Sequence, residues 1–485
     1  TEIYTLSLHD ALPISAMQNT ISQKTWYFDT EKLVFQHLLE MSKEKFGKPI
    51  KYVQYLVMYD MKWQLRTVVP SGVLTEEEKK QYLELLHVIL QDIDDDMIAT
   101  QKNCLSLHYL LAYQLKYQKD CRDEITFDGG LVCFHGQRLT HMARRRFLTL
   151  DFVDIKDNVL EITGQADYWI YEDDYKILFE DQNGTEYYPT YYPLPFRTRH
   201  SLLGDYGDVR GYHVSIPLAG VRRLRAVFEY KNGERCYMMI GYGKFCQLTH
   251  AMDSSYGLYD HHILRAKGKT IYVQKKTRKR YRKCERRYCL ELVKKGYFKE
   301  CFYRYATRVF RKIHSNKKIW LLSDRINLAR DNGEALFQYL NRIDTGNVDV
   351  YFDISKKCSD YERMKQIGKV VPHGSFRYCM YFLSADKIIS AHIDEYVINA
   401  FGVKRDYLKN LFRFDFVFLQ HGLTKDDLSG WVNRFNKNIS LFVTAAKPEY
   451  QSIVDGNYFY TDKEVKLTGF PRFDNLVANK TKKQI

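Results

Sequence analysis

The chain lacks the features that mark several common protein classes. Its ten cysteines include no C-x-x-C pair, and no cysteine and histidine spacing typical of a zinc site occurs. No apolar run reaches the roughly 18 residues that a membrane-spanning helix needs. There is no G-x-G-x-x-G and no Walker loop. We therefore predict reduced thiols, no metal and no cofactor, and exclude dinucleotide oxidoreductases and P-loop kinases.

The two ends of the chain are treated separately. Thr1–Ile14 resembles one reading frame of a common sequencing adaptor, so we predict that residues 1–15 are an artefact and leave them out of the fold argument. Residues 15–50 show no signal-peptide order, which predicts a cytosolic protein or one bound to the cytoplasmic face of the cell membrane. The chain stops at Ile485 soon after a motif expected in mid-protein, so we expect a gene fragment open at both ends.

A helical pattern fills most of residues 16–140. From Lys32 to about Lys119, apolar residues recur every three or four positions. Thr75, followed by three glutamates, has the character of an N-cap with an acidic first turn. The stretch Tyr55–Arg66 resembles the helical tail of family-2 glycosyltransferases. The alternative is a helical packing region without chemistry of its own.

Residues 141–250 change to a period of two, which indicates strands. Asn183-Gly184 and Asn232-Gly233 lie between such runs, and Asp157-Asn158 separates another two. Asn-Gly between alternating segments is a strong hairpin signal. We predict an antiparallel β-sandwich over this region.

Basic residues are concentrated in residues 251–318. Between Arg265 and Lys318 there are 21 lysines and arginines against three glutamates, although the whole chain has a net charge of only +15. Six residues between these cations have near-helical spacing, which predicts a basic amphipathic helical linker. They are Tyr288, Leu292, Tyr297, Cys301, Tyr305 and Val309. Such a helix suits an anionic membrane surface; a solvated linker and a nucleic-acid-binding segment are the alternatives.

The predicted membrane-binding cations lie together in this segment. They are Arg278, Lys279, Arg280, Arg282, Lys283, Arg286 and Arg287. Since no recognised nucleic-acid-binding fold surrounds them, we expect no nucleic acid partner.

Short apolar strands alternate with helices through residues 319–485, which predicts a parallel, doubly wound α/β sheet. Ligands of such sheets bind beyond the carboxyl ends of the strands. The residues that follow the predicted strands are therefore the candidates: Ser323-Asp324-Arg325, Pro372-His373-Gly374-Ser375, Ser390-Ala391-His392, Gln420-His421-Gly422 and Thr468-Gly469-Phe470-Pro471-Arg472.

His421 is the candidate for proton transfer. It ends an apolar strand, and Gly422 behind it leaves space beside the imidazole. A histidine accepts a proton near neutral pH, a role worth roughly 10² to 10⁴ in rate. The alternative is a structural histidine bonded to a neighbouring strand.

The motifs of this last segment resemble those of the CDP-glycerol:poly(glycerophosphate) glycerophosphotransferase family of teichoic-acid synthesis. The matching elements, in order, are Asp331-Asn332-Gly333-Glu334, Gly374-Ser375, Ala385-Asp386, Gln420-His421-Gly422, Lys425, Asn433, Glu449, Thr468-Gly469, Pro471-Arg472 and Asp474. The resemblance implies the first of two Rossmann-like domains that face each other across a cleft. This first domain offers the acceptor-side histidine, and the second holds CDP-glycerol.

The resemblance also implies a reaction and its site residues. Glycerol phosphate would move from CDP-glycerol to the terminal hydroxyl of a lipid-linked anionic polymer, releasing CMP, with His421 as base. The implied substrate-binding residues are Gln420, Gly422, Lys425, Arg472, Asp474 and Ser375. Asp331 and Asn332 suit a helix cap. The donor half would lie beyond Ile485, so we expect the fragment to be inactive.

Two other functions stay open at this point. The visible half does not identify the donor, so another polyol phosphate or a sugar could be transferred in cell-surface polymer synthesis. A basic nucleic-acid-binding protein is the alternative from a different class.

Overall fold

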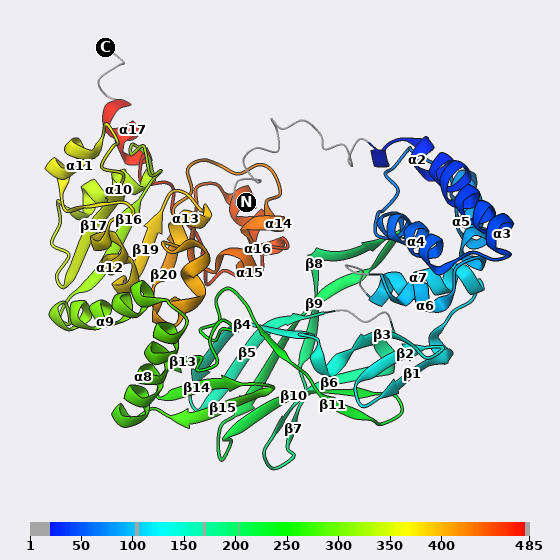
Figure 1. Ribbon diagram of the computed structural model, residues 1–485. Coiled ribbons are helices and arrows are strands. Elements are labelled where there is room, and N and C mark those ends of the chain that lie inside the picture. The colour runs from blue at the N-terminus through cyan, green and yellow to red at the C-terminus, as the bar shows by residue number, and fades with distance from the viewer. Residues whose placement is uncertain (1–19, 102–105, 168–170, 203, 481–485) are drawn as a thin grey trace.

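The computed structural model describes residues 20–101, 106–167, 171–202 and 204–480, and the predicted artefact at residues 1–15 lies outside them. N-terminal helices and a C-terminal parallel sheet lie at opposite ends of the molecule, with antiparallel sheets between them (Figure 1). The order of helical, antiparallel and parallel regions thus follows the order expected from the sequence.

The N-terminal helices pack around a shared apolar core. They are α2 (Lys24–Asp29), a π-helical turn η1 (Thr30–Gln36), α3 (His37–Phe46), α4 (Lys51–Leu65), α5 (Glu76–Gln91), α6 (Asp95–Ala99) and α7 (Ser106–Tyr117). Thr75 caps α5 in a capping box, because its hydroxyl accepts the Glu78 backbone N–H while the Glu78 carboxylate accepts that of Thr75. The helices end before the predicted limit, and β1 (Ile125–Asp128), β2 (Leu131–Phe134) and β3 (Gln137–His141) form a small antiparallel sheet instead.

Two larger sheets form the middle of the molecule. One has the order β12-β4-β5-β9-β8, and the other β13-β14-β15-β10-β6-β7 with β11 beside β10. The strands are β4 (Leu148–Lys156), β5 (Val159–Ala166), β6 (Tyr175–Asp181), β7 (Glu186–Tyr187), β8 (Thr190–Ser201), β9 (Gly204–Pro217), β10 (Arg223–Tyr230), β11 (Arg235–Tyr237), β12 (Ile240–Tyr242), β13 (Tyr256–Tyr259), β14 (His262–Lys267) and β15 (Thr270–Lys275). Pairing is antiparallel except between β12 and β4.

The predicted turns lie where strands reverse. Asp157 and Asn158 both have positive φ between β4 and β5, as a two-residue hairpin turn requires. Gly184 and Gly233 likewise have positive φ in the β6–β7 and β10–β11 connections. The strands continue beyond the predicted limit at 250, because β13 to β15 occupy residues expected in the helical linker.

The basic segment forms two helices rather than one. Helix α8 (Arg278–Lys294) and helix α9 (Phe298–Ile313) are separated by Gly296, whose φ of +81° ends the first helix. The six residues expected on one face are divided by this break. Tyr288 and Leu292 are buried, whereas Tyr305 and Val309 are exposed.

The C-terminal region is a seven-stranded sheet in the order β18-β17-β16-β19-β20-β21-β22, and all its strand pairs are parallel. Its strands are β16 (Lys318–Ser323), β17 (Val348–Ile354), β18 (Val370–Pro372), β19 (Lys387–Ser390), β20 (Asp415–Phe418), β21 (Ile439–Thr444) and β22 (Val465–Leu467). Its helices are α10 (Asn332–Leu340), α11 (Tyr361–Ile367), α12 (Phe376–Ser384), α13 (Glu395–Ile398), α14 (Ser429–Val432), α15 (Arg434–Lys437), α16 (Lys447–Asp455) and α17 (Phe473–Lys480).

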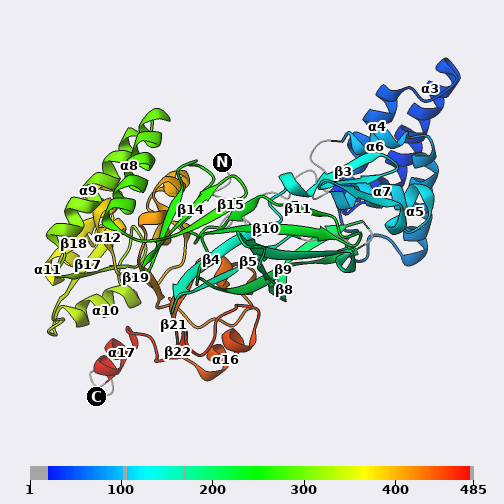
Figure 2. The ribbon, with the colours of Figure 1, turned by 90° about the horizontal axis from the view of Figure 1, so that it is seen from below.

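Each face of this sheet carries its own apolar core. Helices α9 and α12 lie on one face and α10 on the other (Figure 2). Tyr303 of α9 and Phe382 of α12 belong to the first core, and Phe337 of α10 and Met364 of α11 to the second. Helices on both faces make the sheet doubly wound, in agreement with the alternating pattern of the sequence.

The antiparallel and parallel regions are in direct contact. Phe196 of β8 packs against Phe459 with ring centroids 5.6 Å apart, and Phe152 of β4 lies 5.6 Å from Phe435. Lys409 donates a hydrogen bond to the carbonyl of Gly243 at 3.0 Å. The sandwich therefore supports the parallel sheet on one side.

Candidate functional site

Strand register brings three predicted residues to one edge of the parallel sheet. Ser323 of β16 pairs with Ser390 of β19, which pairs in turn with Phe418 of β20. Arg325 and His392 each follow their paired serine by two residues. The carboxyl ends of β16, β19 and β20 thus place Arg325, His392 and His421 along one line, where ligands of such sheets bind.

His421 is exposed and held in one orientation. Its Nδ1 lies 3.3 Å from the carbonyl oxygen of Ala391. A carbonyl only accepts, so Nδ1 is the donor in this contact, and in the neutral form of the ring the lone pair lies on Nε2. The ring also stacks on His392, with centroids 4.8 Å apart and planes at 11°. The arrangement leaves Nε2 available to take a proton from a bound hydroxyl.

His392, on which the His421 ring stacks, is buried. Burial lowers the pKa of His392, and the neighbouring charges of His421 and Arg325 lower it further. Its Nε2 lies 3.8 Å from a carboxylate oxygen of Asp331, too far for a hydrogen bond. A neutral His392 adds no positive charge beside His421. The sequence had placed His392 at a strand end without giving it a role.

Gln420 precedes the catalytic candidate in a left-handed conformation with φ of +58°. It is buried, and its Nε2 donates to Glu449 Oε1 at 2.9 Å while its Oε1 accepts from the Thr424 hydroxyl at 2.9 Å. Its backbone carbonyl accepts from Asn332 Nδ2 at 2.6 Å. These bonds hold a conformation that costs about 1 kcal/mol or more. The geometry gives Gln420 a supporting position, although we had expected it to bind substrate.

Asp331 caps α10, as the sequence predicts, by accepting the Asn332 backbone N–H at 2.8 Å. Asp324 takes three further N–H groups at the same helix start at 2.8 to 3.0 Å, and burial raises its pKa to about 7. The guanidinium of Arg472 donates to Asp331 Oδ1 at 2.9 Å, and the Arg472 backbone N–H donates to Asn332 Oδ1 at 3.1 Å. Arg472, predicted to bind phosphate, therefore already has a carboxylate partner.

The remaining predicted binding residues differ in their exposure and in their partners. Lys425 is exposed and makes no ion pair within the described part of the chain, and Gly422 has open space where a Cβ would be. Asp474 is exposed in the first turn of α17. Ser375 instead caps α12, because its hydroxyl accepts the Tyr378 backbone N–H at 3.1 Å.

A paired imidazole and carboxylate lie at the far end of the same edge. His373 Nδ1 is 2.8 Å from Asp353 Oδ2, and burial raises the pKa of Asp353. His373 belongs to the strand-end residues named from the sequence, but its partner follows only from the β17–β18 pairing. Among the described residues, no group of three potential ligands is arranged to hold a metal ion.

Helix α9 exposes five apolar side chains beside three cations. The five are between 44% and 73% exposed and follow helical spacing. They are Phe298, Phe302, Tyr305, Val309 and Ile313, which we call the α9 stripe. The seven predicted cations lie on the neighbouring α8, all exposed and without an ion pair among the described residues. None of the described helices combines the length and apolarity needed to cross a bilayer.

Arg304 fixes α9 to the rest of the molecule. Its guanidinium is fully buried and bonds to Glu285 of α8 at 2.7 and 2.9 Å, to Asn410 Oδ1 at 2.8 Å and to the Tyr256 hydroxyl of β13 at 3.1 Å. This cluster joins both helices, the sandwich and the loop before β20. The α9 stripe therefore has a fixed orientation relative to the parallel sheet.

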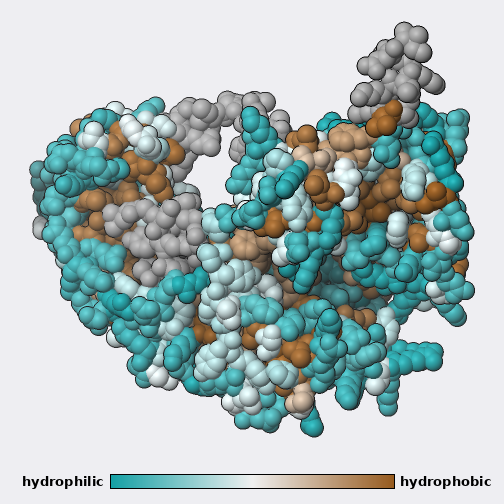
Figure 3. Space-filling model, turned by 180° about the vertical axis from the view of Figure 1, so that it is seen from behind, coloured by the Kyte–Doolittle hydropathy of each residue, from teal (hydrophilic) through white to brown (hydrophobic). Residues whose placement is uncertain are grey.

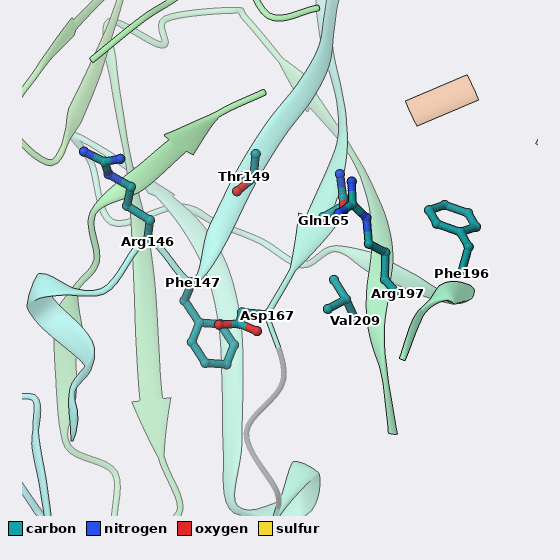
Figure 4. Close-up of a pocket in the computed structure, with 8 residues that line it drawn as sticks. All are labelled: Arg146, Phe147, Thr149, Gln165, Asp167, Phe196, Arg197 and Val209. Atoms are coloured by element: carbon teal, nitrogen blue, oxygen red, sulfur yellow. The ribbon is translucent and has the colours of Figure 1, made fainter. Parts of the chain in front are cut away.

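A pocket lies on the antiparallel part of the molecule (Figure 4). Its volume is about 400 Å³, and β4, β5, β8 and β9 supply most of its lining. Its charged lining residues are Arg146, Asp167 and Arg197, and Arg146 points away from Arg197 in this view. No predicted site residue lines it. The back of the molecule is largely hydrophilic, with apolar residues in separate patches (Figure 3).

A doubly wound sheet with an oriented histidine at its carboxyl edge is the framework of a ligand-binding enzyme domain. Residues 303–485 match the family model described as CDP-Glycerol:Poly(glycerophosphate) glycerophosphotransferase. This match of the C-terminal segment confirms the resemblance seen in its motifs.

One curated relative matches almost the whole chain. It is the minor teichoic acid biosynthesis protein GgaB of Bacillus subtilis (strain 168), 31% identical over 497 residues. The match covers 97% of this chain and 54% of GgaB, so the chain spans about half the length of that relative.

Two of the similar solved structures show only distant likeness. S. aureus TarS has a TM-score of 0.29 at 10% identity, covering 52% of this chain and 49% of its own. The wall teichoic acid polymerase TagF has a TM-score of 0.28 at 14% identity, covering 41% and 50%.

Proposed function

We propose that the chain carries the acceptor-side half of a transferase of teichoic-acid-type polymer synthesis, which moves glycerol phosphate from CDP-glycerol to a polymer hydroxyl. The observation that carries the proposal is the oriented imidazole of His421, exposed at the sheet edge with Nε2 free. The match of residues 303–485 to the glycerophosphotransferase family model supports the class of reaction.

In the proposed reaction, His421 acts as the general base. The terminal hydroxyl oxygen of the acceptor forms a bond to the β-phosphorus of CDP-glycerol, and its proton passes to Nε2 of His421. The bond between that phosphorus and the bridging oxygen breaks, and CMP leaves with the oxygen. Transfer of this kind depends mainly on positioning and on stabilising phosphate charge. Lys425, exposed and without an ion partner among the described residues, is suited to the second task.

The same enzyme would act at the cytoplasmic face of the membrane, where its lipid-linked acceptor lies. The α9 stripe supplies apolar side chains for the headgroup boundary, and α8 beside it supplies cations for anionic lipid. Each cation near such a surface contributes about 1 kcal/mol. The binding surface differs from the one we expected, because the apolar side chains come from α9 and most of the cations from α8.

The proposal is tested by supplying the full-length protein with a glycerol phosphate oligomer and one of several donors, and measuring nucleotide release. The donors are CDP-glycerol, CDP-ribitol and UDP-linked sugars. Release of CMP from CDP-glycerol, with growth of the oligomer by one unit, is expected. Turnover of another donor alone would overturn the donor assignment, and no turnover of any donor would overturn the reaction.

A further inference from the structure

Two exposed cations flank the stacked histidines. Lys425 follows β20 on one side, and Arg325 follows β16 on the other. Because β16, β19 and β20 are neighbours, Arg325 and His392 occupy equivalent positions two residues past a paired serine. The charge of Arg325 contributes to lowering the pKa of His392, which agrees with this closeness. The sequence had placed Arg325 at a strand end and assigned it no role.

Arg325 differs from the other arginines near the N-terminal end of α10 because its guanidinium has no carboxylate partner within the described residues. The neighbouring arginines are each paired with a carboxylate. Arg330 and Arg363 bond to Asp360 at 3.0 and 3.2 Å, Arg363 also bonds to Glu334 at 2.5 Å, and Arg472 bonds to Asp331 at 2.9 Å. The local acids therefore neutralise three arginines and leave Arg325 available to an anionic ligand.

We propose that Arg325 binds the phosphate that precedes the attacking hydroxyl in the acceptor, while His421 receives the proton of that hydroxyl. This rests on the proposed function and names its acceptor subsite. A guanidinium suits phosphate because its planar fork donates two parallel hydrogen bonds. Neighbouring strands lie about 4.8 Å apart, so β16 and β20 are separated by about 10 Å. The three carbons of a glycerol unit and the reach of the arginine side chain span that separation.

The proposal also changes the role of Arg472. Since its guanidinium holds Asp331, which caps α10 and faces His392, Arg472 is a positioning residue. Its loss should lower turnover with little change in acceptor affinity. Loss of Arg325 should instead weaken acceptor binding directly.

The test measures acceptor binding at His421 itself, because the many cations of α8 would bind any polyanion nonspecifically. The 485-residue chain is treated with diethyl pyrocarbonate at rising concentrations of a synthetic glycerol phosphate dimer with a free terminal hydroxyl, at about 150 mM salt. Modification of His421 is read by peptide mass spectrometry. We expect the dimer to protect His421, and Arg325→Ala to raise the half-protecting concentration at least about tenfold, as the loss of a charge-assisted bond predicts.

Matched variants separate binding from folding. Arg325→Lys keeps the charge but loses the fork, so an intermediate shift is expected. Arg342→Ala removes an exposed arginine beyond the opposite end of α10 and should leave protection unchanged. Equal protection of the wild-type chain and of Arg325→Ala, or no protection of either, would overturn the proposal.

The same variants distinguish this inference from the reaction itself. If Arg325→Ala leaves protection and the acceptor KM unchanged while CMP release is observed, the subsite assignment fails and the proposed function stands. If Arg325 governs protection but no donor is turned over by the full-length protein, the proposed function fails and the anion site remains.

Discussion

The strand ends of the parallel sheet and the α8–α9 helices contain the two predicted functional regions, and they are built in opposite ways. At the strand ends, Gln420, Asn332 and Asp331 are bonded to protein partners, so His421 has a fixed orientation. On the α9 stripe, side chains such as Phe302 lie exposed, and the cations beside it on α8 make no ion pairs among the described residues. A group that takes one proton needs fixed neighbours, whereas side chains that meet a fluid lipid surface need freedom.

Removing the imidazole of His421 should impair the function of the strand ends and leave that of α8 and α9 unchanged. For His421→Ala in the full-length protein we expect the rate of CMP release to fall by about 10² to 10⁴, the usual contribution of a general base. Binding to anionic vesicles should stay unchanged. His261→Ala, at a fully exposed turn of the sandwich, is the control and should retain activity. Full activity of His421→Ala would contradict the base assignment.

Breaking the buried ion cluster of Arg304 and Glu285 should test whether that cluster holds α8 and α9 in place. Glu285→Gln leaves Arg304 buried without its carboxylate, which should lower the free energy of unfolding by about 3 to 5 kcal/mol. Chemical denaturation measures this change. The exposed Glu362→Gln is the control, since its surface ion pair with Lys365 is screened by solvent and should contribute little to stability. Equal stability of the two variants would show that the cluster does not anchor α9.

Charging the stripe should separate membrane binding from chemistry. Phe302→Glu with Tyr305→Glu removes two aromatic side chains from the lipid boundary, each worth about 1.5 kcal/mol or more when buried. We expect affinity for vesicles with about 30% anionic lipid to fall about 100-fold, while turnover of a soluble oligomer persists. Tyr188→Glu, exposed on the sandwich, is the control. Unchanged affinity, or preference for an oligonucleotide over vesicles, would contradict the membrane surface.

Much of the fold could be read from local patterns. The period of the apolar residues distinguished helices from strands, and short turns such as Asn183-Gly184 marked reversals because they require positive φ. The limits of each region were less predictable. Strands β13 to β15 occupy the first part of the segment predicted as a helical linker, and most of the cations on which that prediction rests lie after them. Gly296 similarly divided a helix whose spacing read as continuous.

The candidate site was predicted in part. The predicted strand ends identified His421, His392 and Arg325 as candidates, because the residues that follow parallel strands lie at one edge of the sheet. Which of them face a ligand depends on partners distant in the sequence. Arg472 finds a carboxylate 141 positions away, and Gln420 finds Glu449, so both are occupied. No local pattern shows such pairings.

The smallest predicted effect is a loss of folding stability at acidic pH. It should arise at the strand ends and not in α8 and α9. The pKa of His392 is lowered by burial and by the charges of His421 and Arg325, while Asp331 and Asp394 raise it. The folded state therefore binds fewer protons at His392 than the unfolded state, so stability is lost as pH falls below the ordinary histidine pKa of about 6.5. Denaturation at pH 7.5 and 5.5 should therefore show lower stability at the acidic pH, with His392 contributing to the loss.

His392→Gln should reduce the loss in stability between these two pH values, because glutamine keeps a polar side chain that does not titrate. Vesicle binding by α8 and α9 should change little over the same interval, since lysine and arginine stay charged. Substituting the exposed His261 in the same way should leave the pH dependence as it is in the unmodified chain. If His392→Gln and the unmodified chain lose equal stability on acidification, His392 is not the group responsible, and the stacked imidazoles do not carry the acid sensitivity of the strand-end region.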